Sequence, residues 1–373
     1  MLPHSWLLSV PYACSGSAGE EACSLNGAFD LATGLCECDH GWHGKDCGKL
    51  RLAESYPVAL DRRWSWGGAV VRLNERWHAY LRSGPFGNSS EPCAKSPDQG
   101  ATGEVKSPAG IAHLTSSSLF GPYLQEEDTV AVGSHIDSVT ATSLPSADTP
   151  VLMWAEKGIQ FMHLTINGTN ESQGHLQFAE GSSLPANPSI VASRNEKRLF
   201  LCGRHGGSKA NHSGWNITLE RILVSVSTKG TNLSSTMFTQ GTTVLSNVAA
   251  EDPFCWANSR GYHMLLHMFD CNSLYMHVGL HAWSVDGIQW SASKTPAYNG
   301  SVVFADNNQT VNFSRRERPF LVFAKDRPLA LVNSAQRNFF WVSGWINQLL
   351  SQYRLNVCVC PSGISHRIAD STK

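Results

Sequence analysis

The chain has 373 residues, which is enough for one large domain and a small additional module. Charged residues make up only 16% of it, and the formal net charge is -1 with a pI near 6.9. This balance provides no basic surface of the kind that binds nucleic acid, so we expect no nucleic-acid partner.

The N-terminal segment, residues 1–13, contains one short apolar run, Trp6–Val10. No basic region precedes this run, and the run is too short to cross a membrane, so it fits at most the remnant of a signal peptide. We find no stretch of membrane-spanning length elsewhere in the sequence and predict no membrane span.

The region that follows is rich in cysteine. It runs from Cys23 to Cys47 and ends in the spacing C-x-C-x2-G-W-x-G-x2-C. On this specific ending it resembles an EGF-like module, a type that needs cross-links because it is too short to bury a stable core. The resemblance implies the disulfides Cys23–Cys36 and Cys38–Cys47. Phe29 stands where the family has its third cysteine, and a zinc site would need paired C-x2-C spacings that are absent.

The rest of the sequence repeats one pattern: a polar residue, often proline, a short apolar strand, a tight turn and a second apolar strand. Apolar runs separated by polar turns predict β-hairpins. Hairpins that recur about every 50–65 residues are typical of β-propeller blades. The pattern is found at 68–81, 187–201, 251–266 and 318–332.

Sequons for N-glycosylation are unusually frequent. Composition alone would give roughly three matches to N-x-S/T, and the chain has nine, which indicates a glycosylated surface. Together with eleven cysteines they favour an oxidising, secretory route, and we predict a secreted or extracellular protein. The nine sites are Asn88, Asn167, Asn170, Asn211, Asn216, Asn232, Asn299, Asn308 and Asn312.

The blade pattern and its opening phrases resemble the five-bladed β-propellers of glycoside hydrolase family 43 and families 32 and 68, over residues 64–345. In that superfamily the inner strands open with phrases such as D-P, P-D or E-x-P, and their acidic side chains meet in a central pocket. The resemblance implies a glycosidase that acts through this pocket.

Glycosidic cleavage needs two carboxyl groups that flank the bond. By the resemblance, Glu251 in an E-x-P phrase is the general acid, and Asp137 is the carboxylate that tunes and positions it. Gly67 stands where the family has the aspartate that acts as general base. Because glycine cannot take a proton, the base is lost or has moved, with Asp137, Asp252 and Glu317 as the candidates.

Candidate ligand contacts lie near the openings of the blades. Trp64 and Trp66 precede the first inner strand at the expected pocket mouth, and aromatic faces suit the C–H surfaces of sugars. Arg316 and Arg318 could equally form structural ion pairs. Asp148 is a rival to Asp137 as the start of the second blade. The full set of expected substrate-binding residues is Trp64, Trp66, His135, Asn187, Arg316, Glu317 and Arg318.

We therefore expect an all-β chain, with a five-bladed β-propeller preceded by a small disulfide-linked EGF-like module. The expected function is a glycosidase acting on an extracellular polysaccharide or glycan, and the alternative is a non-catalytic glycan-binding or adhesive propeller that lacks the base. We expect a possible protein partner through the EGF-like module, no organic cofactor and no metal, with a central calcium suggested by analogy only. The expected segments are 1–13 (signal remnant), 14–50 (EGF-like module), 51–63 (linker), 64–350 (propeller) and 351–373 (tail).

Overall fold

The structure is a computed structural model, and nearly all regular structure in the described residues is β-strand, with one short helix, α1 (Ala18–Ala22). No helix among these residues is both long and apolar enough to cross a membrane. The described residues are 18–58, 63–85, 109–133, 136–182, 184–205, 221–245, 248–268, 278–313, 315–337 and 341–349.

Four antiparallel sheets of four strands follow one another along the chain, and each is one blade. The first blade consists of β6 (Arg63–Leu73), β7 (Arg76–Pro85), β8 (Ala109–Ser116) and β9 (Leu124–Gly133). The second consists of β10 (Asp137–Thr142), β11 (Val151–Ala155), β12 (Ile159–Leu164) and β13 (Asn170–His175). The third consists of β15 (Ala186–Ala192), β16 (Leu199–His205), β17 (Arg221–Val226) and β19 (Thr242–Thr243). The fourth consists of β20 (Ala250–Ala257), β21 (Tyr262–Met268), β22 (Val278–Ser284) and β23 (Ser291–Ala292).

The fifth blade draws on both ends of the described chain. Its outer strand β5 pairs with β28, so that Tyr56 lies opposite Ile346. Residues 52–58, which the sequence placed in a linker, are therefore a strand of the propeller. An unpaired edge of β28 would expose backbone donors and acceptors, and the pairing with β5 covers this edge. This sheet runs in the order β26 (Arg315–Ala324), β27 (Arg327–Arg337), β28 (Trp341–Leu349), β5 (Leu52–Val58), β24 (Ser301–Phe304) and β25 (Thr310–Asn312).

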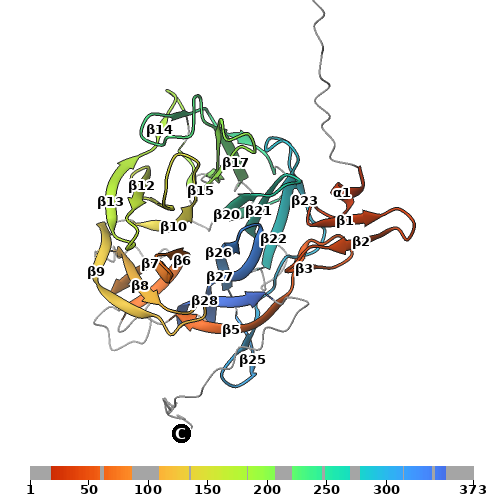
Figure 1. The fold of residues 1–373 in the computed structure, drawn as a ribbon, viewed down its shortest axis with the longest axis horizontal. Coiled ribbons are helices and arrows are strands. Elements are labelled where there is room, and N and C mark those ends of the chain that lie inside the picture. Colours follow the sequence, from red (N-terminus) through yellow and green to blue (C-terminus); the bar gives the residue numbers. More distant parts are fainter. Residues whose placement is uncertain are drawn as a thin grey trace, which may run out of the picture.

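The five blades form a closed ring around a central axis (Figure 1). The inner strands β6, β10, β15, β20 and β26 each contact the next, and β26 contacts β6. A short parallel pair of strands, β14 (Gln177–Phe178) and β18 (Met237–Phe238), joins the outer parts of the second and third blades. The predicted five-bladed β-propeller is confirmed.

The cysteine-rich N-terminal region packs against the fourth blade, on the outside of the ring (Figure 1). Trp42 stacks on Trp256 of β20 with ring centroids 6.1 Å apart, and Arg260 forms an ion pair with Asp39. The buried amide of Asn26 contacts His281 of β22 at 3.3 Å. Its elements are α1, β1 (Gly27–Asp30), β2 (Leu35–Cys38), β3 (Trp42–His43) and β4 (Lys49–Leu50).

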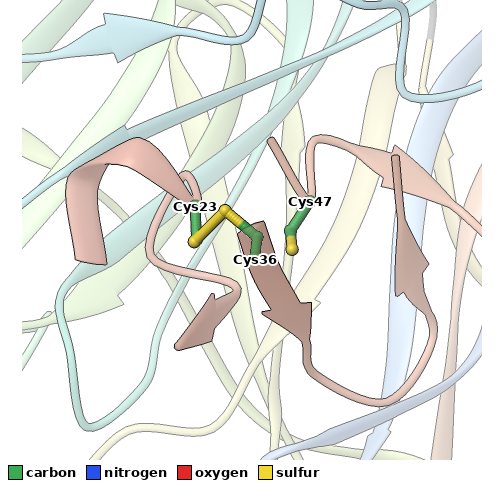
Figure 2. A group of neighbouring side chains, drawn as sticks. All are labelled: Cys23, Cys36 and Cys47. Atoms are coloured by element: carbon green, nitrogen blue, oxygen red, sulfur yellow. A yellow bond between two sulfur atoms is a disulfide. The ribbon is translucent and has the colours of Figure 1, made fainter. Parts of the chain in front are cut away.

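Three disulfides are present among the described residues. Cys23–Cys36 and Cys38–Cys47 are the two that the EGF-like resemblance implied. Figure 2 shows Cys23 bonded to Cys36, with Cys47 beside them, so this sulfur cluster is cross-linked and offers no set of thiolate ligands for a metal. The EGF-like kinship itself stays a prediction. The third disulfide, Cys202–Cys255, joins β16 of the third blade to β20 of the fourth.

Six of the nine predicted glycosylation sites lie within the described residues, and all six asparagines are exposed. These are Asn167, Asn170, Asn232, Asn299, Asn308 and Asn312. Asn88, Asn211 and Asn216 lie outside the described residues.

Candidate functional site

Each inner strand carries a β-bulge near its start, so five bulges meet around the axis at one end of the ring. One residue in each bulge has a positive φ, a conformation that costs energy for any residue with a side chain. Residues from all five bulges line a central cavity of about 20 Å³, which has room for about one water molecule. The residues of positive φ are Gly67 (74°), Ser138 (51°), Asn187 (53°), Asp252 (54°) and Arg318 (52°).

The residue just before the positive-φ position is acidic in three of the five blades. Asp137, Glu251 and Glu317 hold this position in the second, fourth and fifth blades, whereas Trp66 and Ala186 hold it in the first and third. Asp137 opens the inner strand β10, while its rival Asp148 precedes β11. The ring therefore brings together carboxylates that are up to 180 positions apart in the chain. We call Asp137, Glu251, Asp252 and Glu317, with the basic side chains that contact them, the axial cluster.

Glu251 is held by two basic groups. Its Oε2 accepts a hydrogen bond from Arg204 Nη1 at 2.8 Å, and its Oε1 lies 3.3 Å from His267 Nδ1. Burial alone would raise the pKa of Glu251, but the hydrogen bond and charge of His267 and the charge of Arg204 outweigh it and lower the pKa. An ionised Glu251 has no proton to give, so these contacts oppose the role of general acid that the resemblance implied.

Glu317 lies next to Glu251, but its pKa is shifted in the opposite direction. Arg315 Nη2 is 2.5 Å from its Oε1, and His267 Nε2 is 3.9 Å from the same atom. Burial is the largest influence on this carboxyl, and together with the charge of Glu251 it raises the pKa of Glu317. Only 1% of the Glu317 side chain is exposed, so this carboxyl is almost out of contact with solvent.

Asp137 is the most exposed carboxylate of the axial cluster, with 36% of its side chain accessible. Arg318 Nη1 lies 2.9 Å from its Oδ1, and Arg82 Nη1 lies 3.2 Å from the same oxygen. Burial works to raise the pKa of Asp137, but these two guanidinium groups outweigh it and lower the pKa. Asp137 is therefore an ionised carboxylate at the accessible edge of the cluster.

Gly67, at the predicted position of the general base, is covered by Arg318. A Cβ atom on Gly67 would lie 2.5 Å from Arg318 Cδ, which is far too close. The other four blades hold serine, asparagine, aspartate and arginine at the same positive φ, so backbone conformation alone does not require glycine here. Glycine is present because the Arg318 side chain occupies the region into which a carboxylate at position 67 would project.

Asp252 is buried within the fourth bulge. Its carboxylate accepts hydrogen bonds from the Asn187 side chain and, at 3.3 Å, from the backbone N–H of Arg318. Burial is the dominant influence and raises the pKa of Asp252 to about 7. Asn187 and Asp252 thus join the third, fourth and fifth blades below the accessible edge, which is a structural role.

Two of the expected ligand contacts are placed differently from the expectation. Trp66 is buried, not placed at an open mouth, and its ring lies under the Arg315 guanidinium at 5.1 Å. Arg316 faces away from the cluster, because alternate residues of a strand point to opposite sides. Its guanidinium contacts the carbonyl of Asn299 at 2.9 Å, so its role is structural. The side chain of Trp64 and the whole of His135 lie outside the described residues.

The predicted site residues do not include Arg82, Arg204, Arg315 or His267. Three of them sit on second strands of blades, opposite the bulges: His267 pairs with Glu251, and Arg204 pairs with Ala186. The sequence predicts the turn of each hairpin. The residue that lies opposite a site residue follows from that turn only if the bulge of the inner strand is known.

A divalent cation does not fit the axial cluster as it stands. Ligand atoms of Glu251, Asp252, His267 and Glu317 all lie within 4.8 Å of one another, as in a metal site. However, arginines contact these carboxylates directly and already balance their charge. Burial would lower the pKa of His267, but the carboxylates of Glu317 and Glu251 outweigh it and raise the pKa, and an imidazolium cannot bind a cation. The calcium suggested by analogy therefore has no suitable ligand set here.

The raised pKa of Asp252 gives a test of this electrostatic arrangement. A group with a folded-state pKa above its unfolded value stabilises the fold at low pH, and this contribution is lost as pH rises through the folded pKa. We expect Asp252→Asn, which does not titrate, to gain stability relative to the wild type by about 2 kcal/mol between pH 5 and pH 7.5. Urea unfolding of both proteins at the two pH values measures this difference. A difference that does not change with pH would mean that Asp252 is ionised in the folded protein.

The fold and this site define a five-bladed β-propeller with a charged cluster at one end of its axis. No family model matches the chain, and no curated protein matches it in sequence. Solved structures share the fold of this chain, but their sequence identity to it is low, so the likeness shows the fold alone.

Three of the similar structures are described as glycoside hydrolases or arabinofuranosidases. The catalytic domain of a Coprinopsis cinerea GH62 α-L-arabinofuranosidase has a TM-score of 0.54 at 11% identity, over 83% of this chain and 97% of that one. A GH62 hydrolase in complex with xylotriose has a TM-score of 0.55 at 10% identity, over 81% and 98%. The Podospora anserina α-L-arabinofuranosidase in complex with cellotriose has a TM-score of 0.52 at 9% identity, over 79% and 95%. The chain thus has the propeller fold of these hydrolases.

Proposed function

We propose that this protein binds a glycan at the axial cluster and does not hydrolyse it. The observation that carries this proposal is the placement of Arg318 over Gly67, where the resemblance requires the general base. Hydrolysis needs one carboxyl that keeps a proton and a second that flanks the same bond. The two accessible carboxylates, Asp137 and Glu251, both have lowered pKa values, so neither serves as the acid.

Several features support a glycan as the ligand. Two structural neighbours are an α-L-arabinofuranosidase and a GH62 hydrolase in complex with xylotriose, and the site occupies the end of the propeller axis where inner strands converge. Partly exposed charged side chains of Asp137, Arg204 and Arg315 offer the hydrogen-bond donors and acceptors that sugar hydroxyl groups require. The proposal includes a secreted, N-glycosylated protein, which the exposed sequon asparagines and three disulfides support.

Binding of an oligosaccharide panel by calorimetry tests the proposal. Xylotriose and cellotriose, the ligands named for two neighbours, are the first probes. We expect at least one saccharide to bind, and Asp137→Asn to weaken it about tenfold through loss of a charged hydrogen bond. Asp148→Asn is the matched control, because Asp148 is exposed in the connection between β10 and β11, away from the bulges. Failure of every saccharide in the panel to bind, or equal loss in both variants, would refute the proposal.

A second candidate function is hydrolysis by Glu251 and Glu317. Their carboxyl oxygens lie within 4.8 Å, and their pKa values are pushed apart, lowered for Glu251 and raised for Glu317. Opposite shifts in a carboxyl pair mark a nucleophile or base and an acid. The 1% exposure of Glu317 is the reason that we place this candidate second.

A further inference from the structure

Among the described residues, the axial cluster contains more basic than acidic side chains. Each of its carboxylates contacts at least one arginine, so the four carboxylates are balanced by four guanidinium groups. His267 adds a fifth basic group between Glu251 and Glu317. The basic groups of the cluster are Arg82, Arg204, Arg315, Arg318 and His267.

Two of the arginines are accessible at the edge of the cluster. About a fifth of the side chain is exposed in each, 20% for Arg204 and 23% for Arg315. Arg204 comes from the third blade and Arg315 from the fifth, so they flank the fourth blade, which supplies Glu251. A guanidinium has five N–H donors in a planar fork, so an arginine that contacts one carboxylate can also donate to a second anion.

A buried donor in the same cluster points to a missing ligand atom. The indole N–H of Trp66 is buried and has no hydrogen-bond partner among the described residues, although buried polar groups are nearly always paired. Trp66 holds the position in β6 that Asp137, Glu251 and Glu317 hold in their strands. Its ring lies against Arg315, so this donor belongs to the arginine-lined part of the cluster.

We propose that the glycan bound at the axial cluster is acidic, and that Arg204 and Arg315 bind the carboxylate or sulfate group of one of its sugars. This inference rests on the proposed glycan binding and narrows its ligand class. Arginine is suited to such groups because its fork matches the oxygens of a carboxylate or sulfate. An anionic ligand also offsets the positive excess of the cluster, whereas a neutral sugar leaves it unchanged.

The test compares each acidic glycan with its own neutral form. The probes are a uronic-acid oligosaccharide with its carboxyl-reduced form, and a sulfated glycan with its desulfated form. We expect one acidic form to bind at least about tenfold more tightly than its neutral form, with affinity that falls as salt rises. Which pair shows the difference distinguishes a carboxylate from a sulfate ligand.

Arginine variants assign the effect to the cluster. We expect Arg204→Met and Arg315→Met to reduce the preference for the acidic form to about twofold or less, while Arg204→Lys and Arg315→Lys retain part of it. Arg72→Met is the control, since Arg72 is exposed at the opposite end of β6. Thermal unfolding of each variant confirms that it is folded.

The outcomes separate this inference from the proposed function. If neutral forms bind as tightly as acidic ones, the acidic-ligand inference is wrong and the glycan-binding function stands. A preference that persists in both methionine variants also overturns the inference, because the acidic group is then bound elsewhere. If no saccharide binds, both proposals fail.

Discussion

Replacing Arg318 by methionine is expected to lower the free energy of unfolding by about 3–5 kcal/mol, because it takes a cation away from the buried Asp252 and one of two guanidinium groups away from Asp137. Arg318 Nη1 lies 2.9 Å from Asp137 and 3.8 Å from Asp252, and it also contacts the Ser138 hydroxyl. One side chain thus connects three of the five bulges. Chemical unfolding of the variant, monitored by tryptophan fluorescence, measures the loss.

The control for this substitution is Arg221→Met, at an exposed position where β17 begins. We expect it to change stability by no more than about 0.5 kcal/mol, as is usual for surface substitutions. A loss below about 1 kcal/mol for Arg318→Met would show that water, not Arg318, compensates these carboxylates. The ion pairs of Arg318 would then not explain why its side chain lies over Gly67.

Removal of the Cys202–Cys255 disulfide is the second change with a large expected effect. The cross-link closes a loop with a sequence separation of 53, for which chain entropy predicts a stabilisation of about 4 kcal/mol. Cys202 lies two residues before Arg204 in β16, and Cys255 lies four residues after Glu251 in β20. We therefore expect the double variant Cys202→Ala/Cys255→Ala both to unfold at lower denaturant concentration and to bind glycan more weakly.

The matched comparison is the Cys38–Cys47 disulfide, which has a sequence separation of 9 and lies outside the ring. The same entropy model predicts about 2.6 kcal/mol for it, and its removal leaves the axial cluster untouched. If the Cys202–Cys255 variant loses less stability than the Cys38–Cys47 variant, the third and fourth blades do not depend on their cross-link.

The blade starts could be predicted from the sequence because their signal is local. A polar residue, a proline and an apolar run occur within a few positions, and this pattern predicts Asn187 and Glu251 at the openings of inner strands. Asp137 is predicted there only by the resemblance to the glycoside hydrolase propellers, with Asp148 as its rival. The two disulfides of the N-terminal region were implied by the resemblance to EGF-like modules, which rests on the specific spacing from Cys36 to Cys47.

The composition of the cluster could not be predicted, because it depends on non-local pairing. Arg82 and His267 reach the cluster from second strands, in a register that the bulges shift. The protonation state of Glu251 could not be predicted either. Its E-x-P phrase is typical of the general acid, but Arg204 and His267 lower its pKa. Likewise, β5 completes the fifth blade by pairing with a strand almost 300 residues away.

The most direct test of the central claim is a product assay on a glycan that the protein binds. The protein is incubated with its saccharide ligand, and mass spectrometry and a reducing-end assay follow the ligand over time. We expect the ligand to remain intact, because Arg318 covers Gly67 and the accessible carboxylates are ionised. Cleavage of the ligand that is abolished by Glu251→Gln or Glu317→Gln would contradict it and establish a hydrolase.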